Sequence, residues 1–451
     1  MSETLRSSML YRIWCVLAAL YAESALRRFF NALHDGWGRL WAESRVARFC
    51  ARDGKLTAAW RGSVACAVFT VVLGAVPMLL GALYRRFREL FDGSAAVRLG
   101  FACGASVPRA LGWLLLAMLV TPYEIWNNLY SLAALLVFLV LLYVGAIRRR
   151  SLRPDVASLG PWAVCFACLV VFSYLVSSHT DLSYRFLFFH LTGMLCVLLV
   201  VSAVRSEGEY VRLAGFAALG VFAASVYGVV QRLQGIEVNP SYVDLTVNEG
   251  MPGRVFSVFE NPNTFAEVLV MLLPVTAGLF FAARTRLGKA AAAVSFLAGT
   301  VSLAMTYSRA SWIGFVVAAA VFVFLMNRRL VPWFVLLGLF ALPLLPQTIV
   351  NRLLTIFNSS DSSTASRIPI YEAALRLIRN HTLFGVGLGT DTVRQVMTDE
   401  LYYYGTAPFV HCHDIYLQIW AEMGLVGLLA FLGSMASAVK NGAKAALSPE
   451  T

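Results

Sequence analysis

The sequence predicts an all-α polytopic membrane protein, and its composition and its apolar runs lead to this prediction. Of its 451 residues, 59% are hydrophobic and 14% are charged, whereas soluble domains carry about 25% charged residues. The mean hydropathy is +0.70. Many apolar runs reach the roughly 20 residues that a helix needs to cross a bilayer, where backbone groups must pair within the segment. About ten or eleven membrane helices are expected on this basis.

The formal net charge of +12 does not indicate nucleic-acid binding, because the basic residues stand between apolar runs. This distribution is typical of the positive-inside rule, which places basic loops in the cytoplasm. The connections assigned to the cytoplasm carry Arg148–Arg150 with Arg153, Arg205 with Arg212, Arg284 with Arg286 and Lys289, and Arg328–Arg329. The connections that then fall on the outer side are 179–183, 232–262, 307–309 and 350–410.

The predicted spans follow from the apolar runs. They are 64–83, 108–124, 126–146, 159–178, 184–204, 210–231, 263–283, 289–306, 310–326, 331–349 and 412–433. The first of them has basic residues at both ends and contains Pro77, so both ends resemble cytoplasmic boundaries. We expect segment 64–83 to be a re-entrant or interfacial element, which leaves about ten true spans.

Residues 1–60 are basic, and their apolar runs are too short to span. A degenerate repeat places an aromatic residue three positions before a serine, starting at Tyr21, Trp41, Trp60 and Phe91. Serine suits the N-cap of a helix, and arginine mixed with apolar residues suits an anionic membrane surface. We expect amphipathic helices on the cytoplasmic surface, with a poorly ordered basic extension as the alternative. The remaining predicted parts are a helical core (61–349), a large extracytoplasmic loop (350–410), a last membrane helix (411–434) and a short tail (435–451).

The outer loop 350–410 is the largest polar segment of the chain, and it contains one clear helical pattern. Ser366 suits an N-cap, and Pro369 falls in the first turn, where its missing N–H does no harm. The helix should run to about Asn380. Its apolar face should consist of Ile370, Ala374, Leu377 and Ile378.

Three arginines on the predicted outer side are candidates for chemistry. Arg309 stands in T-Y-S-R-A-S-W, between two spans with almost no loop. An arginine this close to hydrocarbon is costly, and such residues are by default functional or paired. The alternative is an anchor that snorkels to the interface. Arg254 and Arg367 lie in the longer outer connections, where an ordinary solvated arginine is the alternative.

His411 and His413 flank Cys412 where the chain re-enters the membrane. Their number and spacing do not fit a usual structural zinc site, so no metal is expected. A histidine at a water–lipid boundary is suited to accept a proton; a histidine that is merely satisfied at the interface is the alternative. Glu422 lies nine residues beyond His413, roughly 13 Å further along a helix. Its carboxylate needs a proton or a partner such as Arg309, and we interpret it as structural support.

Gly385, Gly387 and Gly389 form a G-x-G-x-G pattern that follows a predicted helix. A dinucleotide-binding loop would follow a strand, so a tight turn with close backbone approach is the better interpretation. The sequence contains no D-x-D motif. It therefore lacks the obvious acidic ligands of a Mg²⁺- or Mn²⁺-dependent sugar transferase, and no cofactor is expected.

Four motifs make the chain similar to the O-antigen ligase and O-antigen polymerase superfamily of membrane glycosyltransferases. They are T-Y-S-R-A-S-W (306–312), S-R-I-P-I-Y-E-A (366–373), F-G-V-G-L-G (384–389) and H-C-H-D-I-Y-L-Q-I-W-A-E-M-G-L-V-G-L (411–428). In addition, R-V-F-S-V-F-E-N-P-N-T-F-A-E (254–267) resembles the G-N-P-N element of many Gram-positive relatives. The resemblance covers roughly residues 250–430, and it rests on the order and spacing of these motifs.

The resemblance implies a GT-C-like helical fold and glycan transfer from undecaprenyl diphosphate to a hydroxyl of a glycan, lipid or protein. Transfer would take place on the outer face of the cytoplasmic membrane. By the same resemblance, Arg309 and Arg367 grip the diphosphate and His413 acts on the acceptor. The further substrate-binding candidates are Arg254, His411, Asn261, Asn263 and Glu422. Guanidinium groups can stabilise a departing diphosphate without a metal, and no paired nucleophilic carboxylate is apparent, so inversion at the donor carbon is expected.

Two departures from the family pattern keep alternatives open. Asp414 stands where the family usually has asparagine, and the tail after Met435 cannot span, whereas relatives continue through further spans. The sequence does not choose between a polymerase and a ligase. A shortened, inactive member that acts as a scaffold is one alternative. A glycan or lipid transporter is another, although its charges should lie at mid-membrane and its halves should repeat.

Overall fold

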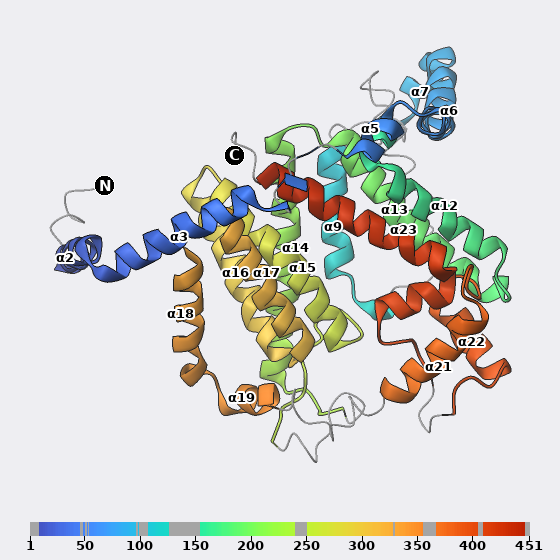
Figure 1. Ribbon diagram of the computed structural model, residues 1–451. Coiled ribbons are helices and arrows are strands. Elements are labelled where there is room, and N and C mark those ends of the chain that lie inside the picture. Colours follow the sequence, from blue (N-terminus) through green and yellow to red (C-terminus); the bar gives the residue numbers. More distant parts are fainter. Residues whose placement is uncertain are drawn as a thin grey trace. The chain divides into compact units, whose positions relative to one another are not determined.

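The computed structural model describes residues 9–45, 48–49, 52, 54–95, 98, 107–125, 154–239, 250–327, 330–354, 367–404 and 409–446 (Figure 1). Every regular element in this part of the chain is helical. The elements of its first half are α2 (Met9–Glu23), α3 (Ala25–Glu43), α5 (Lys55–Arg61), α6 (Val64–Arg86), α7 (Arg88–Gly93), α9 (Val107–Val120), η1 (Tyr123–Ile125), α11 (Val156–Leu159), α12 (Pro161–Leu175), α13 (Thr180–Ala203) and α14 (Glu207–Gln234).

The second half continues the all-helical pattern. Its elements are α15 (Pro262–Ala282), α16 (Arg286–Met305), α17 (Arg309–Asn327), α18 (Val331–Ala341), η3 (Leu342–Leu344), α19 (Gln347–Leu354), α21 (Arg367–Asn380), α22 (Thr390–Asp399) and α23 (Ile415–Ala446). Six of the described helices are long and apolar enough to cross a membrane, namely α13, α14, α15, α16, α17 and α23. The prediction of an all-α polytopic membrane protein is confirmed.

Three shorter apolar helices, α9, α12 and α18, coincide with further predicted spans. The predicted span 126–146 lies outside the described residues, so the total of ten or eleven spans stays a prediction. Segment 331–349 does not form the single helix that was predicted, because α18 ends at Ala341 and α19 begins at Gln347. Pro343 and Pro346 fall in the interruption, and proline interrupts a helix because it lacks the N–H donor.

Segment 64–83 lies in α6, which follows α5 after a bend of 54°. Trp60 and Ser63, from the third copy of the repeat, lie at this bend. Ser63 caps α6 by accepting a hydrogen bond from the backbone N–H of Cys66, and the indole N–H of Trp60 donates to the Val156 carbonyl. If α5 and the first part of α6 together cross the membrane, they form a seventh span. The same bend also fits the re-entrant element expected from the sequence.

The chain divides into two compact units. The first contains residues Met1–Asp53, Val316–Leu345 and Val439–Thr451. Within it, Trp333 of α18 packs against Tyr21 of α2 and Phe30 of α3, with ring centroids 5.4 and 5.8 Å apart. Ser24 caps α3 as the repeat predicted, because its hydroxyl accepts from the Arg27 N–H.

The second unit contains Gly54–Phe315 and Pro346–Ala438 and holds every candidate site residue. Helices α14, α15 and α16 pack side by side in it, and α9 covers α14 (Figure 1). Glycines permit this close packing, since a Cβ on Gly220 of α14 would meet Leu119 of α9 at 2.5 Å, and one on Gly299 of α16 would meet Leu273 of α15 at 2.7 Å. The buried side chains at the centre of this group include Phe265, Leu269, Leu273 and Leu303.

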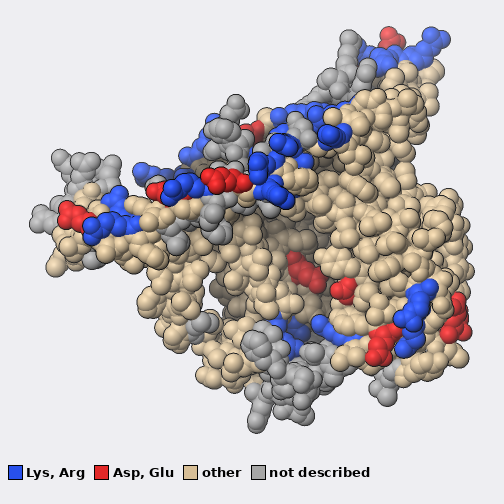
Figure 2. All heavy atoms as spheres, in the orientation of Figure 1, with Lys and Arg blue, Asp and Glu red and all other residues tan. Residues whose placement is uncertain are grey.

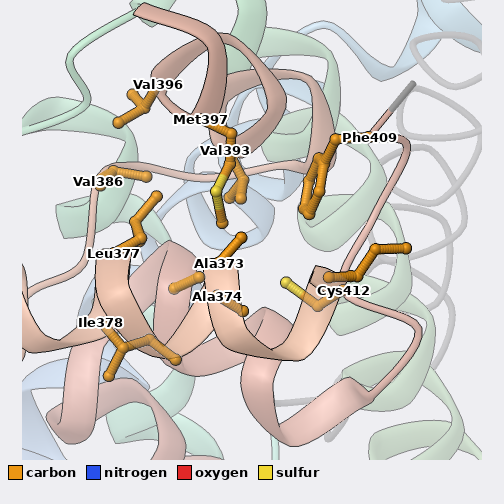
Figure 3. Packing of buried hydrophobic residues seen from close by; sticks show 12 residues of the cluster. Ala373, Ala374, Leu377, Ile378, Val386, Val393, Val396, Met397, Phe409 and Cys412 are labelled. Carbon is orange, nitrogen blue, oxygen red and sulfur yellow. The ribbon is translucent and has the colours of Figure 1, made fainter. Parts of the chain in front are cut away.

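Helices α21 and α22 form a second core in the same unit (Figure 3). The predicted apolar face of α21 is confirmed, since Ile370, Ala374, Leu377 and Ile378 are all buried, together with Ala373. Val393, Val396 and Met397 of α22 face this core. Phe409 and Cys412 close it from the segment that leads into α23. This core therefore supports the backbone on which the two histidines stand.

Helix α23 is broken at Gly424, where the backbone adopts φ 69° and ψ −173°. The segment F-G-V-G-L-G (384–389), which we call the glycine loop, and Thr382 just before it supply hydrogen bonds in place of those that the helix loses at this break. Val386 and Gly387 donate to the carbonyls of Ala421 and Glu422, and Leu425 donates to the Thr382 carbonyl at 2.8 Å. The prediction of a tight turn with close backbone approach is confirmed, because Gly385, Gly387 and Gly389 all have positive φ and no room for a Cβ.

Candidate functional site

Arg309 is the first residue of α17, and only three residues separate it from the end of α16. The turn is tight, and Tyr307 within it has a φ of 52°. Hydroxyl groups hold the turn, because Thr306 Oγ1 accepts from the Ser308 N–H and Ser308 Oγ lies 3.0 Å from Ser311 Oγ. The first N–H groups of a helix carry partial positive charge. An arginine at this position therefore adds to a local field that attracts anions.

Two buried arginines bracket the Arg309 turn. Arg254 Nε donates to the Thr306 carbonyl at 2.7 Å, and Arg352 Nε lies 3.5 Å from the Tyr307 carbonyl. Their side chains leave only 7% and 5% of their surface exposed. Two guanidinium groups on consecutive carbonyls fix the backbone that carries Arg309. We call Arg254, Arg309 and Arg352 the arginine cluster.

The N-P-N element supports the arginine cluster. Asn261 is the N-cap of α15 and accepts from the Asn263 N–H at 2.8 Å. Asn263 Oδ1 in turn accepts from Arg254 at 2.6 Å. Pro262 occupies the first helical position, where it costs no hydrogen bond. The two asparagines that the sequence suggested as substrate-binding thus also cap a helix and orient Arg254.

His411 and His413 form the second part of the site. Cys412 between them is fully buried in the core of α21 and α22, while the His413 side chain is exposed. The two imidazole rings lie 4.0 Å apart between centroids, and the His413 N–H donates to His411 Nδ1 at 3.0 Å. That nitrogen must carry no proton to accept this bond. His413 has a φ of 52°, which is uncommon for any residue other than glycine.

Arg367 stands at the start of α21 and lies close enough to influence both rings. Enclosure by protein atoms, followed by the neighbouring His411 and Arg367, lowers the pKa of His413 from 6.5 to about 4. Enclosure and Arg367 also lower the pKa of His411. Both imidazoles are therefore neutral at pH 7, the form in which a histidine can accept a proton. Burial raises the pKa of the Cys412 thiol to about 12, so this thiol stays protonated.

Asp414 is the N-cap of α23, because its side chain accepts from the Leu417 N–H at 2.8 Å. Asparagine and aspartate serve about equally well in this position. The departure from the family's His-Asn pattern therefore preserves the capping interaction.

Glu422 is buried at the break in α23, and the structure gives it a different neighbour from the Arg309 that the sequence suggested. Gln418 Nε2 donates to its carboxylate at 2.7 Å, and the Gly389 N–H also bonds to it. Gln418 Oε1 accepts from the Cys412 N–H at 2.9 Å. These contacts connect a buried carboxylate to the backbone between the two histidines.

The candidate residues thus form two clusters, the arginine cluster and the group of Arg367, His411 and His413. Sequence reasoning missed Arg352 and Gln418. Arg352 stands on α19, where only its burial marks it as unusual, and Gln418 is one polar residue in an apolar helix. Among the described residues, no three His, Cys, Asp or Glu side chains come together closely enough to hold a metal ion.

Exposure separates two populations of basic residues at opposite ends of α14 and α16. Arg205, Arg284 and Arg286 are exposed near the N-termini of these helices, and Arg284 pairs with Glu207 at 3.6 Å. Arg254 and Arg352, near the other end, are buried. Figure 2 shows charged atoms in a few groups on a face that is otherwise mostly uncharged. Topological anchors are expected to be exposed, so the buried pair needs another explanation.

Comparison with known proteins identifies one family. Residues 292–432 match the model of the family described as O-antigen ligase. The match runs from α16 to α23 and includes Arg309, Arg352, Arg367, His413 and Glu422. No curated protein and no solved structure matches the chain.

Proposed function

Since residues 292–432 form an O-antigen ligase family domain in a multi-pass membrane protein, we propose that the chain transfers a glycan from undecaprenyl diphosphate to an acceptor hydroxyl. It would act as a polysaccharide polymerase or an O-antigen ligase. One observation carries the proposal: two buried arginines fix the turn that presents Arg309. The fixed turn places Arg309 at the start of α17, where a guanidinium group can bind the oxygens of a diphosphate.

In the proposed reaction the acceptor oxygen attacks the anomeric carbon of the donor glycan. The bond from that carbon to the diphosphate oxygen breaks, and its electron pair leaves with undecaprenyl diphosphate. Arg309 and Arg367 stabilise the charge that develops on this leaving group. His413 accepts the proton of the acceptor hydroxyl, because its own imidazole ring is unprotonated at pH 7. A single displacement inverts the anomeric configuration, and the two guanidinium groups make a metal unnecessary.

We place the site on the extracytoplasmic side. Arg205, Arg284 and Arg286 are exposed at the opposite ends of the same helices, as cytoplasmic anchors are. The lipid carrier would present its diphosphate at the outer water–lipid boundary. There Arg309 and Arg367 would meet the phosphates, while the undecaprenyl chain stays in the bilayer.

Cysteine labelling of intact cells tests this orientation. In a variant without native cysteines, Arg379→Cys on exposed α21 is expected to react with a membrane-impermeant maleimide. Arg286→Cys, equally exposed at the start of α16, is the matched control and should react only after the cells are opened. The reverse pattern would place the site in the cytoplasm.

Purified protein in nanodiscs tests the activity itself. With a fluorescent oligosaccharide on undecaprenyl diphosphate and a matching acceptor, we expect a covalent product in the presence of excess EDTA. NMR of the new linkage should show inversion relative to the donor. Product formation that depends on an added divalent cation would contradict the metal-independent mechanism. In sealed vesicles, movement of the labelled glycan without bond formation would indicate a transporter. If neither a covalent product nor movement of the glycan is detected, a scaffold is the remaining alternative.

A further inference from the structure

A continuous set of hydrogen bonds leads from the break in α23 to the backbone of His413. The Glu422 carboxylate accepts from Gln418, and Gln418 accepts from the Cys412 N–H. The Cys412 peptide lies between the two histidines, and the His413 N–H donates to the His411 ring. A single glutamine amide therefore joins the membrane-embedded carboxylate to the segment that presents the proposed base.

Glu422 is held from several elements at once. Its backbone carbonyl accepts from Ser173 Oγ of α12 at 2.9 Å and from the Gly387 N–H at 3.1 Å. Its carboxylate meets the Gly389 N–H and faces His190 of α13. Only 7% of Glu422 is exposed. Contacts from α12, α13 and the glycine loop thus leave this carboxylate little freedom to move.

The backbone of His413 requires such support, because its φ of 52° lies in the left-handed region. A non-glycine residue held in a sparsely populated conformation costs about 1–3 kcal/mol and persists only where its surroundings over-determine it. The Cys412 side chain fixes one side of this segment through the α21–α22 core (Figure 3). The bond from the Cys412 N–H to Gln418 fixes the peptide itself.

We infer that Gln418 and Glu422 are positioning residues, which hold His413 in the conformation needed to accept the acceptor's proton. The transfer of the acceptor's proton to His413 rests on the proposed function, whereas the positioning of His413 by Gln418 and Glu422 does not. Glu422 fixes the direction of the Gln418 amide, because the amide NH₂ donates to Glu422 Oε1 at 2.7 Å. The amide oxygen then faces the Cys412 N–H. Without this pair, the Cys412 N–H loses its hydrogen bond to Gln418, and the His413 imidazole moves from its position beside His411.

The test is the titration of His413, measured by NMR on the histidine-labelled full-length protein in nanodiscs. The wild-type ring should titrate well below 6.5, as its enclosed position beside His411 and Arg367 requires. In Gln418→Leu its pKa should rise by about one unit or more toward the ordinary value, because the ring moves away from the protein atoms, His411 and Arg367 that lower it. This readout needs no substrate. If the wild-type protein transfers no glycan, the proposed function fails while the titration still decides whether Gln418 positions the ring.

Kinetics give a second readout. We expect Gln418→Leu to lower kcat by about 10- to 100-fold with KM for the donor changed less than about threefold, since misplacement of a catalytic group by about 1 Å costs on this order. Glu422→Gln keeps an acceptor oxygen for Gln418, so it should lose less activity than Glu422→Leu. This rank order keeps the inference testable if a leucine variant fails to fold.

Gln395→Leu is the matched control. Gln395 donates to Asp399 at 2.8 Å, four residues along α22, in the same spacing as Gln418 and Glu422 but on an exposed surface. The control should change neither the His413 titration nor kcat. A folded Gln418→Leu protein with a wild-type His413 titration and wild-type kcat would overturn the inference. Equal losses in Glu422→Gln and Glu422→Leu would overturn the role of the carboxylate.

Discussion

Replacement of His413 by asparagine is expected to lower kcat for glycan transfer by about 10²- to 10⁴-fold, the range that general-base catalysis contributes. Asparagine is chosen because it tolerates the left-handed backbone that His413 adopts, with φ 52°. The substitution thus removes the base without adding backbone strain. KM for the lipid-linked donor should change little, because the diphosphate contacts come from the arginines. Product formation with purified protein measures both constants.

The dependence of wild-type kcat on pH also tests whether His413 is the base. His413 acts as a base only when neutral, so activity is retained above its pKa and lost as the pH falls through it. Because that pKa is lowered to about 4, kcat should be flat from about pH 8 to about pH 5 and fall only below that. An unperturbed histidine would give a midpoint near pH 6.5.

His179→Asn is the control for this experiment. His179 lies between α12 and α13, where it pairs with Asp399 at 3.4 Å, and it has no role in the proposed reaction. Its replacement should leave kcat within about twofold of wild type. The role of His413 would be refuted by a His413→Asn protein that is folded and fully active. An acid limb of the profile at about pH 6.5 or above would contradict the lowered pKa of its ring.

The sequence allowed prediction wherever one local rule decided the structure. The apolar spacing in 367–380 predicted both the helix and the face it buries, because no other element competes for those residues. Three glycines at alternate positions predicted a tight turn, since only glycine combines positive φ with close backbone contact. The family motifs also nominate Arg309, Arg367 and His413 as site residues, and this assignment stays a prediction.

The remaining features depend on contacts between distant segments, which local patterns do not encode. Arg352 is an ordinary polar residue in its own helix, and it joins the site only because α19 packs its guanidinium against the Tyr307 carbonyl. The break at Gly424 is hidden within an apolar run, and it exists because the glycine loop, well upstream in the chain, supplies the missing hydrogen bonds. Gln418 and Glu422 stand four residues apart on one helix, which is a local spacing, whereas the burial of Glu422 depends on α12 and the glycine loop.

Replacement of Gly424 by alanine is expected to destabilise the protein by about 3–5 kcal/mol, a large part of the roughly 5–15 kcal/mol that holds a typical protein folded. The backbone at φ 69° and ψ −173° falls in a region that is essentially restricted to glycine and costs other residues about 1–3 kcal/mol. In addition, the new Cβ would lie 2.1 Å from the Leu383 carbonyl oxygen. The clash is with backbone and cannot be relieved by a side-chain rotation, so it adds a similar cost.

The midpoint of thermal unfolding in detergent measures this effect, with Gly193→Ala as the matched control. Gly193 lies within α13, and a Cβ added there would meet no neighbouring atom within 4 Å, so alanine should be neutral or stabilise by up to about 1 kcal/mol. Gly424→Ala should unfold at a much lower temperature and should also impair transfer, because the break fixes Glu422 and thereby His413. A Gly424→Ala protein as stable as wild type would mean that α23 can run straight through this position. In that case the glycine loop would have no broken helix to complete, and the buried carboxylate would lose the geometry that aims Gln418 at the histidines.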